Sequence, residues 1–369
     1  MVASSLRIAM MIELYHPSVG GQEVFFQELG ETLVQRGHSV DVYCIGHTGE
    51  LAGTETINGV TIHRNPNGGR YKQPLVKALR RNWTDIVKFS AGVRRIASAH
   101  QHDFYLLNQW PLMHALALPK DVRARSAIHW CEIRTDPILT ACQTRLPRIV
   151  GSNFAVSEAV AVVITEQSGR PCGVLPSGIT LSRYRNTPRD DRSGVLYLGR
   201  IAPHKNLPLL IDAFELAAAK GLTGDLMIAG DGPSRADVEA YAQRSPLASR
   251  VRVLGSVTEA QKLELLSQAA VFGMPSTREG FPRVITESMA SGLPVVTPDF
   301  PGNGSKEVVA QYKAGIVCGT TPTDFAEALL ATEADWNAFS QAGVAAAQTL
   351  DWSHIAETLE ARIQEVLGK

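Results

Sequence analysis

The chain has 369 residues, 44% of them hydrophobic, which is enough apolar material for two well-packed domains but too long for one ordinary core. Lys plus Arg and Asp plus Glu both number 36, so net charge indicates no class of partner, nucleic acid included. The five scattered cysteines form no C-x-x-C pair, which excludes the usual zinc spacing and favours reduced thiols in the cytoplasm.

The first half of the chain alternates strand-like apolar runs with helix-like segments. A first strand is expected at residues 6–12, and a helix follows from about 23 to 36 with Gly37 just past its end. Further strands are expected at residues 39–46, 104–108, 126–130 and 149–157. The order of strand, loop, helix and strand predicts a parallel sheet covered by helices.

The same alternation restarts at residue 195. Strands are expected at residues 195–200, 225–230, 250–257, 271–276 and 293–299, and helices at 207–221, 234–244, 259–269 and 282–292. The expected fold class is therefore α/β, with two Rossmann-like domains facing each other across a cleft. A ligand is expected in that cleft, because ligands of doubly wound sheets bind at the carboxyl ends of the strands.

The expected organisation is a first domain at residues 1–175, a linker at 176–190 rich in Pro, Gly and charge, a second domain at 191–349 and an amphipathic terminal helix at 350–369.

Three glycine-rich or basic loops follow predicted strands. In PSVGG, Gly20 and Gly21 allow close approach of a ligand at a helix N-terminus, although a plain turn explains them equally well. No G-x-G-x-x-G is present, so an NAD enzyme is poorly supported. In GRIAPHK, Arg200 and Lys205 suit a diphosphate, with a solvated basic turn as the alternative. GDGP, residues 230–233, is expected to be a structural turn.

The stretch REGFPRVITE carries two glutamates eight positions apart. Glu279 is expected in a loop, Pro282 in the first turn of a helix and Glu287 in its second turn. The backbone N–H groups between the glutamates would form an anion cradle. Two solvated surface glutamates are the alternative, which the small and apolar neighbours of Glu287 disfavour.

These motifs, read as GRIAPHKN, the two spaced glutamates, ASGLPVV and PSVGG…GHSVDVY, together resemble glycosyltransferase family 4 over nearly the whole chain. The resemblance implies the GT-B fold, a nucleotide-sugar donor held mostly by the second domain and an acceptor held by the first. It also implies retention of anomeric configuration, no required metal or other cofactor, and a terminal helix that crosses back to the first domain. The absence of a D-x-D motif agrees with metal independence.

The resemblance also implies roles for matched residues in the second domain. Arg200 and Lys205 would bind the donor diphosphate, Glu279 would meet the transferred sugar, and Glu287 would bond the ribose hydroxyls.

Other matched residues extend this site. Gly20 and Gly21 would approach the phosphates from the first domain. His129 ends a predicted strand where relatives place a His or Asp near the sugar, although a histidine there is otherwise often structural.

The donor-binding loop itself comprises Gly280, Phe281 and Pro282. The chain reads EGFPR where relatives often read EGFGL, so the resemblance does not fix which sugar the donor carries, and Arg283 is one of the residues that depart.

The sequence therefore predicts a retaining, metal-independent hexosyltransferase that moves a sugar from a UDP- or GDP-sugar to a glycan or lipid-linked acceptor in cell-surface polysaccharide or glycolipid synthesis. A GT-B sugar-nucleotide epimerase and a non-catalytic sugar-nucleotide or glycan-binding protein are the alternatives. The presence of Arg200, Lys205, Glu279 and Glu287 argues against a decayed site.

Positive charge gathers in the first half of the chain, where residues 60–148 hold 15 Lys or Arg against 5 Asp or Glu. The segment at residues 70–95 interleaves basic residues with Trp83 and Phe89. It predicts contact with an anionic membrane, and a cytoplasmic protein peripheral at the inner face, because each cation near such a surface contributes roughly 1 kcal/mol. A solvated helix and a site for an acidic acceptor are the alternatives.

Overall fold

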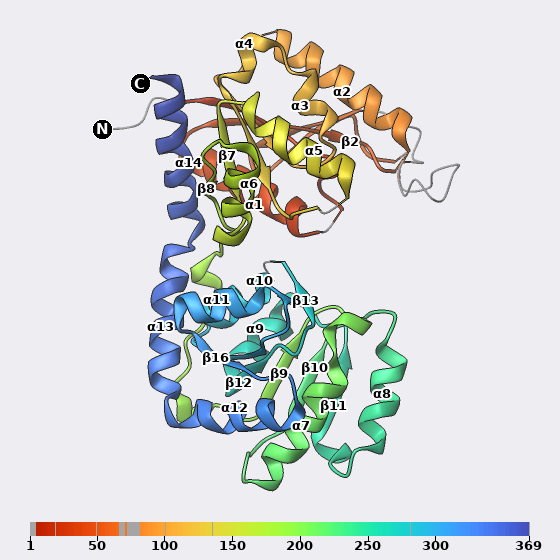
Figure 1. The fold of residues 1–369 in the computed structure, drawn as a ribbon, viewed down its shortest axis with the longest axis vertical. Helices are drawn as coiled ribbons and strands as arrows, with labels where there is room; N and C mark the ends of the chain where they lie inside the picture. The colour runs from red at the N-terminus through yellow and green to blue at the C-terminus, as the bar shows by residue number, and fades with distance from the viewer. Residues whose placement is uncertain are drawn as a thin grey trace. The chain divides into compact units, whose positions relative to one another are not determined.

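The computed structural model describes residues 5–18, 20–48, 50–65, 71, 82–99, 101–134, 136–280 and 282–368, without the side chain of residue 138. The chain forms two compact units: unit 1 is Met1–Gly178 together with Trp352–Lys369, and unit 2 is Ile179–Asp351. Each unit contains its own sheet and hydrophobic core (Figure 1). Within the described ranges, every helix is too short or too polar to cross a membrane.

Unit 1 contains an eight-stranded sheet in the order β3-β4-β2-β1-β5-β6-β7-β8, in which the β3–β4 pair is antiparallel and the other pairs are parallel. Its strands are β1 (Arg7–Met11), β2 (Ser39–Ile45), β3 (Thr54–Ile57), β4 (Val60–Asn65), β5 (Phe104–Asn108), β6 (Ser126–Trp130), β7 (Ser152–Ala155) and β8 (Gly173–Val174). Its helices are α1 (Gly21–Gln35), α2 (Trp83–Ser98), α3 (Met113–Ala117), α4 (Lys120–Arg123), α5 (Pro137–Arg145), α6 (Glu158–Ser168) and α14 (Trp352–Leu367).

Both faces of this sheet are buried, as expected for parallel strands between helix layers. Along β1, Ile8 and Met10 join the core beneath α1 and α14, whereas Ala9 and Met11 join the core beneath α2. This alternation follows from the two-residue period of a strand. The central strands thus lie in the middle of unit 1, and the loops at their carboxyl ends are held on a rigid scaffold.

Helix α14 packs on unit 1, although it follows unit 2 in the sequence (Figure 1). The indole Nε1 of Trp352 donates to Glu28 Oε2 at 2.8 Å, and Arg36 donates to both carboxylate oxygens of Glu360 at 2.6 and 2.9 Å. These contacts join α14 to α1 at two points, while the apolar face of α14 enters the core.

Unit 2 contains a six-stranded parallel sheet in the order β11-β10-β9-β12-β14-β16 and a separate pair, β13–β15. Its strands are β9 (Val195–Leu198), β10 (Leu226–Ala229), β11 (Val251–Gly255), β12 (Val271–Gly273), β13 (Arg278–Glu279), β14 (Val295–Pro298), β15 (Gly302–Asn303) and β16 (Gly315–Cys318). Its helices are α7 (Leu207–Ala219), α8 (Arg235–Arg244), α9 (Glu259–Gln268), α10 (Arg283–Ala290), α11 (Ser305–Tyr312), α12 (Pro322–Ala334) and α13 (Trp336–Thr349).

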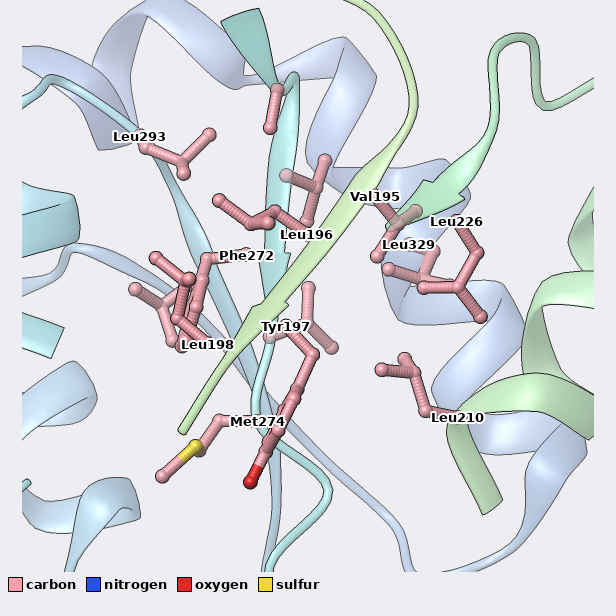
Figure 2. Close-up of a cluster of buried hydrophobic side chains, with 14 of the residues drawn as sticks. Val195, Leu196, Tyr197, Leu198, Leu210, Leu226, Phe272, Met274, Leu293 and Leu329 are labelled. Carbon is pink, nitrogen blue, oxygen red and sulfur yellow. The ribbon is translucent and has the colours of Figure 1, made fainter. Parts of the chain in front are cut away.

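The central strand of unit 2, β9, is fully buried. Figure 2 shows its side chains projecting to both sides, toward Leu226 and Leu329 on one side and toward Phe272 and Leu293 on the other. The loop that leaves β9 therefore starts from a packed strand.

Several features differ from the sequence-based expectations. The β3–β4 hairpin was not anticipated, although Asn58–Gly59, with φ of 49° and 83°, is the usual two-residue hairpin signal. Residues 179–190 of the expected linker belong to unit 2. Pro282 is the N-cap of α10 and Arg283 is its first residue, so Pro282 lies one position before the expected first turn.

Candidate functional site

The loop after β9 is held against the loop after β10 by direct backbone contact. The N–H of Ile201 donates to the carbonyl of Asp231 at 2.9 Å. A Cβ atom at Gly230 would lie 1.8 Å from the carbonyl oxygen of Gly199, and Gly230 has a φ of +140°. The glycine in GDGP is therefore required by close backbone approach.

Arg200 opens the loop after β9, and its side chain is exposed. Its carbonyl accepts a hydrogen bond from the Tyr197 hydroxyl at 3.0 Å. Burial raises the pKa of Tyr197, so that hydroxyl stays protonated and remains a donor. The backbone at Arg200 is thus anchored to the core while its side chain stays exposed.

Lys205 and Glu279 meet at the same edge of the sheet, although they are 74 residues apart in sequence. The carbonyl of His204 accepts from the N–H and the hydroxyl of Thr277 at 2.8 and 3.1 Å, which ties the loop after β9 to the loop after β12. Lys205 Nζ then forms an ion pair with the Glu279 carboxylate, and the two side chains are 12% and 10% exposed.

Glu279 lies in a short strand and not in an irregular loop. Strand β13 pairs in parallel with β15, and the N–H of Gly304 donates to the carbonyl of Glu279 at 3.1 Å. The buried side chain of Asn303 donates to Thr297 Oγ1 at 2.9 Å and to the carbonyl of Pro298 at 2.8 Å. The segment PGNGSKEVV, residues 301–309, therefore supports the backbone of Glu279.

Gly304→Ala is expected to lower the free energy of unfolding by about 1–3 kcal/mol, the usual range for overpacking. A Cβ there would lie 2.3 Å from the carbonyl oxygen of Gly280, while the φ of −65° is itself suitable for alanine. Denaturant unfolding of Gly304→Ala measures the loss, with Gly53→Ala as the control, because nothing lies within 4 Å of a Cβ at Gly53. Equal stability of the two variants would contradict this packing.

Glu287 is placed in α10 and is 8% exposed. Its Oε1 lies 3.0 Å from Nζ of Lys262 on α9, and Lys262 also lies 3.0 Å from Glu259. Sequence analysis missed Lys262. The only signal was an ordinary i,i+3 pairing of Glu259 with Lys262, which does not indicate a contact with another helix.

The remaining residues of the expected donor loop are placed as follows. Gly280 is exposed, Pro282 is half-buried, and Phe281 lies outside the described residues. Over the part of the chain that the structure describes, no group of three or more His, Cys, Asp or Glu side chains is arranged to hold a metal ion.

In unit 1, Gly20 is the N-cap of α1 and Gly21 is its first residue. The carboxylate of Glu23 folds back over Gly20, where a Cβ would lie 2.5 Å from Glu23 Oε2. A carboxylate in the first turn stabilises the helix N-terminus. A phosphate approaching Gly20 would therefore have to displace Glu23.

His129 is fully buried and stacks on Phe25, with ring centroids 4.1 Å apart. Its Nε2 lies 2.9 Å from the carbonyl oxygen of Leu175, and its Nδ1 lies 3.1 Å from the Gln22 side-chain amide. Burial lowers the pKa of His129 to about 4, although the Leu175 carbonyl partly offsets this effect. His129 is therefore neutral near pH 7.

Acidification should destabilise the protein through His129. The unfolded chain binds a proton near the ordinary value of 6.5, so the stabilisation is complete above that pH and is lost as the pH falls from 6.5 toward 4. A shift of one pKa unit corresponds to about 1.4 kcal/mol, so about 2 kcal/mol should be lost between pH 6.5 and 5. Unfolding of wild type and His129→Gln across this range measures the difference. A wild-type pH dependence retained in full by the variant would contradict it.

A cavity of about 510 Å³ lies in unit 1 at the carboxyl ends of β1, β5 and β6, beside the start of α1. Its lining includes Gln22, the residue bonded to His129. Gln109 holds the backbone of two lining residues in place, since its Oε1 accepts from the N–H groups of Cys131 and Glu132 at 3.0 and 3.1 Å. Burial raises the pKa of the Cys131 thiol to about 12, so this thiol is a poor nucleophile.

The basic segment at residues 70–95 is only partly described, because residues 70 and 72–81 lie outside the described ranges. On α2, Lys88, Arg94 and Arg95 are exposed. Trp83 is 42% exposed, whereas Phe89 is buried in the core and offers no surface to a membrane.

Two family models match adjacent parts of the chain. The model described as Glycosyltransferase Family 4 matches residues 19–183, and the model described as Glycosyl transferases group 1 matches residues 180–349. The chain belongs to glycosyltransferase family 4. Its fold is GT-B, as the sequence motifs predicted.

Two relatives carry a lipid or a lipid-linked molecule in their names. The chain is 24% identical to the GDP-mannose:cellobiosyl-diphosphopolyprenol alpha-mannosyltransferase of Komagataeibacter xylinus, over 99% of this chain and 94% of that protein. It is 22% identical to the phosphatidylinositol N-acetylglucosaminyltransferase GPI3 subunit of Saccharomyces cerevisiae, over 80% of this chain and 68% of that protein. The structure of HepE from Anabaena in complex with UDP and glucose superposes with a TM-score of 0.71 at 19% identity, covering 98% of this chain and all of that one.

Proposed function

We propose that this member of glycosyltransferase family 4 transfers a hexose, with retention of anomeric configuration and without a metal ion, from a nucleotide-diphosphate sugar. The observation that carries the proposal is the pair of glutamate–lysine contacts in unit 2, Glu279 with Lys205 and Glu287 with Lys262. Carboxylates accept paired hydrogen bonds from vicinal hydroxyls, and fixed cations at the carboxyl ends of strands suit a diphosphate.

Each of these groups takes a separate part of the donor. Lys205 and the exposed guanidinium of Arg200 neutralise the charge that develops on the leaving diphosphate. Glu279 orients the sugar hydroxyls, and Glu287 binds the ribose hydroxyls, with Lys262 holding its carboxylate in place. In unit 2, Gly280 and Phe281 contribute backbone N–H groups to the phosphates, and Pro282, which has no N–H, holds the start of α10 behind them. In unit 1, the N–H groups of Gly20 and Gly21 become available to a phosphate once Glu23 moves aside.

The transfer itself needs no nucleophile from the protein. The bond between the anomeric carbon and the phosphate oxygen breaks, and the acceptor oxygen forms a new bond to that carbon on the same face. The acceptor proton passes to the leaving phosphate oxygen. The burial of His129 favours a positioning role through Gln22 over direct contact with the sugar.

The donor is a UDP- or GDP-sugar, and the acceptor is a glycan or a lipid-linked molecule of cell-surface polysaccharide or glycolipid synthesis. The names of the Komagataeibacter and Saccharomyces relatives support the acceptor class, and GDP-mannose and UDP in the compared names support the donor class.

A nucleotide panel tests the donor site first. UDP, GDP, UDP-glucose, UDP-N-acetylglucosamine and GDP-mannose are each added during thermal unfolding, because a ligand that binds the native state raises Tm. The ligands that share one base, either uridine or guanosine, are expected to raise the Tm of the wild-type protein. The same rise in Tm is expected in the control Lys220→Ala, whose lysine forms an exposed pair with Glu327, and a smaller rise is expected in Glu287→Gln. A flat panel contradicts the proposal.

Product analysis then separates the rival activities. Transfer in the presence of EDTA, with the anomeric configuration of the product matching that of the donor by NMR, is the expected result. An isomerised nucleotide sugar formed without acceptor would indicate an epimerase. Tight donor binding without turnover on any acceptor would indicate a binding protein.

We also propose that the protein works in the cytoplasm, in contact with the inner membrane face through residues 70–95. The exposed Lys88, Arg94 and Arg95 on α2 support this proposal. Co-sedimentation should give stronger binding to anionic than to neutral vesicles, and substituting these three residues with glutamine should weaken it. Equal binding to both vesicle types would contradict the contact.

A further inference from the structure

The lining of the unit-1 cavity is rich in hydrogen-bond acceptors. Asn108, at the end of β5, lines the cavity and is 5% exposed, and its Oδ1 has no hydrogen-bond partner among the described residues. The carboxylates of Glu13, Glu23 and Glu132 line the same space. A buried acceptor without a partner is costly, so this wall favours a ligand that supplies several donors.

Aromatic surface faces the same cavity. Trp83 and Trp110 both line it, and their rings meet edge to face with centroids 6.2 Å apart. Trp83 is the first residue of α2 and is 42% exposed. An amphipathic aromatic ring beside polar acceptors suits a ligand with an apolar C–H face and hydroxyls at its edge, which describes a sugar ring.

The charge of the lining disfavours an anionic ligand. Three glutamates line the cavity with one arginine, Arg134. Arg134 is already paired with Glu132 at 2.5 Å, and Glu13 accepts from the Tyr71 hydroxyl at 2.6 Å. A phosphate entering the cavity would meet like charges that are only partly compensated, within a Debye length of about 8 Å.

We infer that this cavity binds an uncharged saccharide ring of the acceptor, stacked near Trp110 and hydrogen-bonded through its hydroxyls to Asn108, Glu13 and Glu132. The inference rests on the proposed function, because it names the acceptor class of a proposed transferase. The inference predicts that the protein accepts molecules that end in a neutral sugar and discriminates against molecules whose accepting ring is itself phosphorylated.

Binding measured without a donor tests the inference independently of turnover. Methyl β-D-glucoside, methyl α-D-mannoside, cellobiose and glucose 6-phosphate are titrated to 20 mM (about the range for weak saccharide sites) with saturation-transfer NMR as the readout. At least one neutral saccharide is expected to bind, and glucose 6-phosphate is expected to bind at least about tenfold more weakly. Trp110→Ala should weaken the neutral ligand about tenfold, Trp110→Phe should retain most of the affinity, and Leu116→Ala, an exposed residue outside the lining, should match wild type.

A second variant tests the charge argument. Glu132→Gln removes the partner of Arg134, so the preference for neutral over phosphorylated ligand should narrow. The inference is overturned by preferential binding of glucose 6-phosphate, by neutral binding that Trp110→Ala leaves intact, or by no saccharide binding in the panel. The Tm shifts with nucleotides are recorded on the same samples. Saccharide binding without a nucleotide shift would contradict the proposed function alone, and a nucleotide shift without saccharide binding would contradict this inference alone.

Discussion

Lys205→Ala is expected to lower kcat/KM by about 10²–10³-fold, the usual effect of removing one preorganised group that stabilises developing charge. The position of Lys205 is fixed before the donor binds, because the Thr277 contacts with His204 hold its loop and the ion pair with Glu279 holds its side chain. The leaving diphosphate should lose a compensating cation, so affinity for the free nucleoside diphosphate should fall together with kcat.

The substitution has a second consequence that must be separated from the first. Glu279 is 10% exposed, and removing its lysine leaves a nearly buried carboxylate without that partner, which is destabilising. Lys205→Arg keeps the cation, and the double variant Lys205→Ala/Glu279→Gln removes the unpaired charge, so a double-mutant cycle isolates the interaction. Lys220→Ala serves as the matched surface control. Unchanged affinity for the nucleoside diphosphate in a folded Lys205→Ala protein would refute the role assigned to Lys205.

The main sheet elements of unit 2 could be predicted because their loops carry motifs. The apolar run at residues 195–200 ends in GRIAPHK, and the structure puts Lys205 of that motif against Glu279. The hydrophobic periodicity and the spacing of the motifs were enough to place Lys205 and Glu279 in one site, because parallel strands bring their carboxyl ends to one edge of the sheet.

What could not be predicted depends on contacts between distant segments. Lys262 partners Glu287 from another helix, and no spacing rule connects residues 25 positions apart. The support of Glu279 by β15 depends on Gly304. A glycine is required there because a Cβ would clash with the carbonyl oxygen of Gly280, and only the folded structure shows this contact. His129 was correctly placed at a strand end, but its burial against Phe25 follows from packing that the sequence does not display.

Glu279→Gln and Glu287→Gln are expected to change different kinetic constants. Each substitution keeps the size of the side chain and removes its charge. Glu287 is assigned to the ribose, remote from the reacting carbon, so its loss should raise KM for the donor about tenfold with little change in kcat, the pattern of lost uniform binding.

Glu279 is assigned to the sugar that develops positive charge, so Glu279→Gln should lower kcat by about 10²-fold, because its interactions strengthen in the transition state. Steady-state kinetics on both variants measure the contrast, with circular dichroism as the folding check. Lys262→Met provides an internal comparison, since it removes the partner of Glu287 at 3.0 Å and should reproduce the KM effect without the kcat effect. The same kinetic pattern in both glutamine variants would refute this division of roles, and full activity in both would refute the proposed site, because neither carboxylate would then contact the donor.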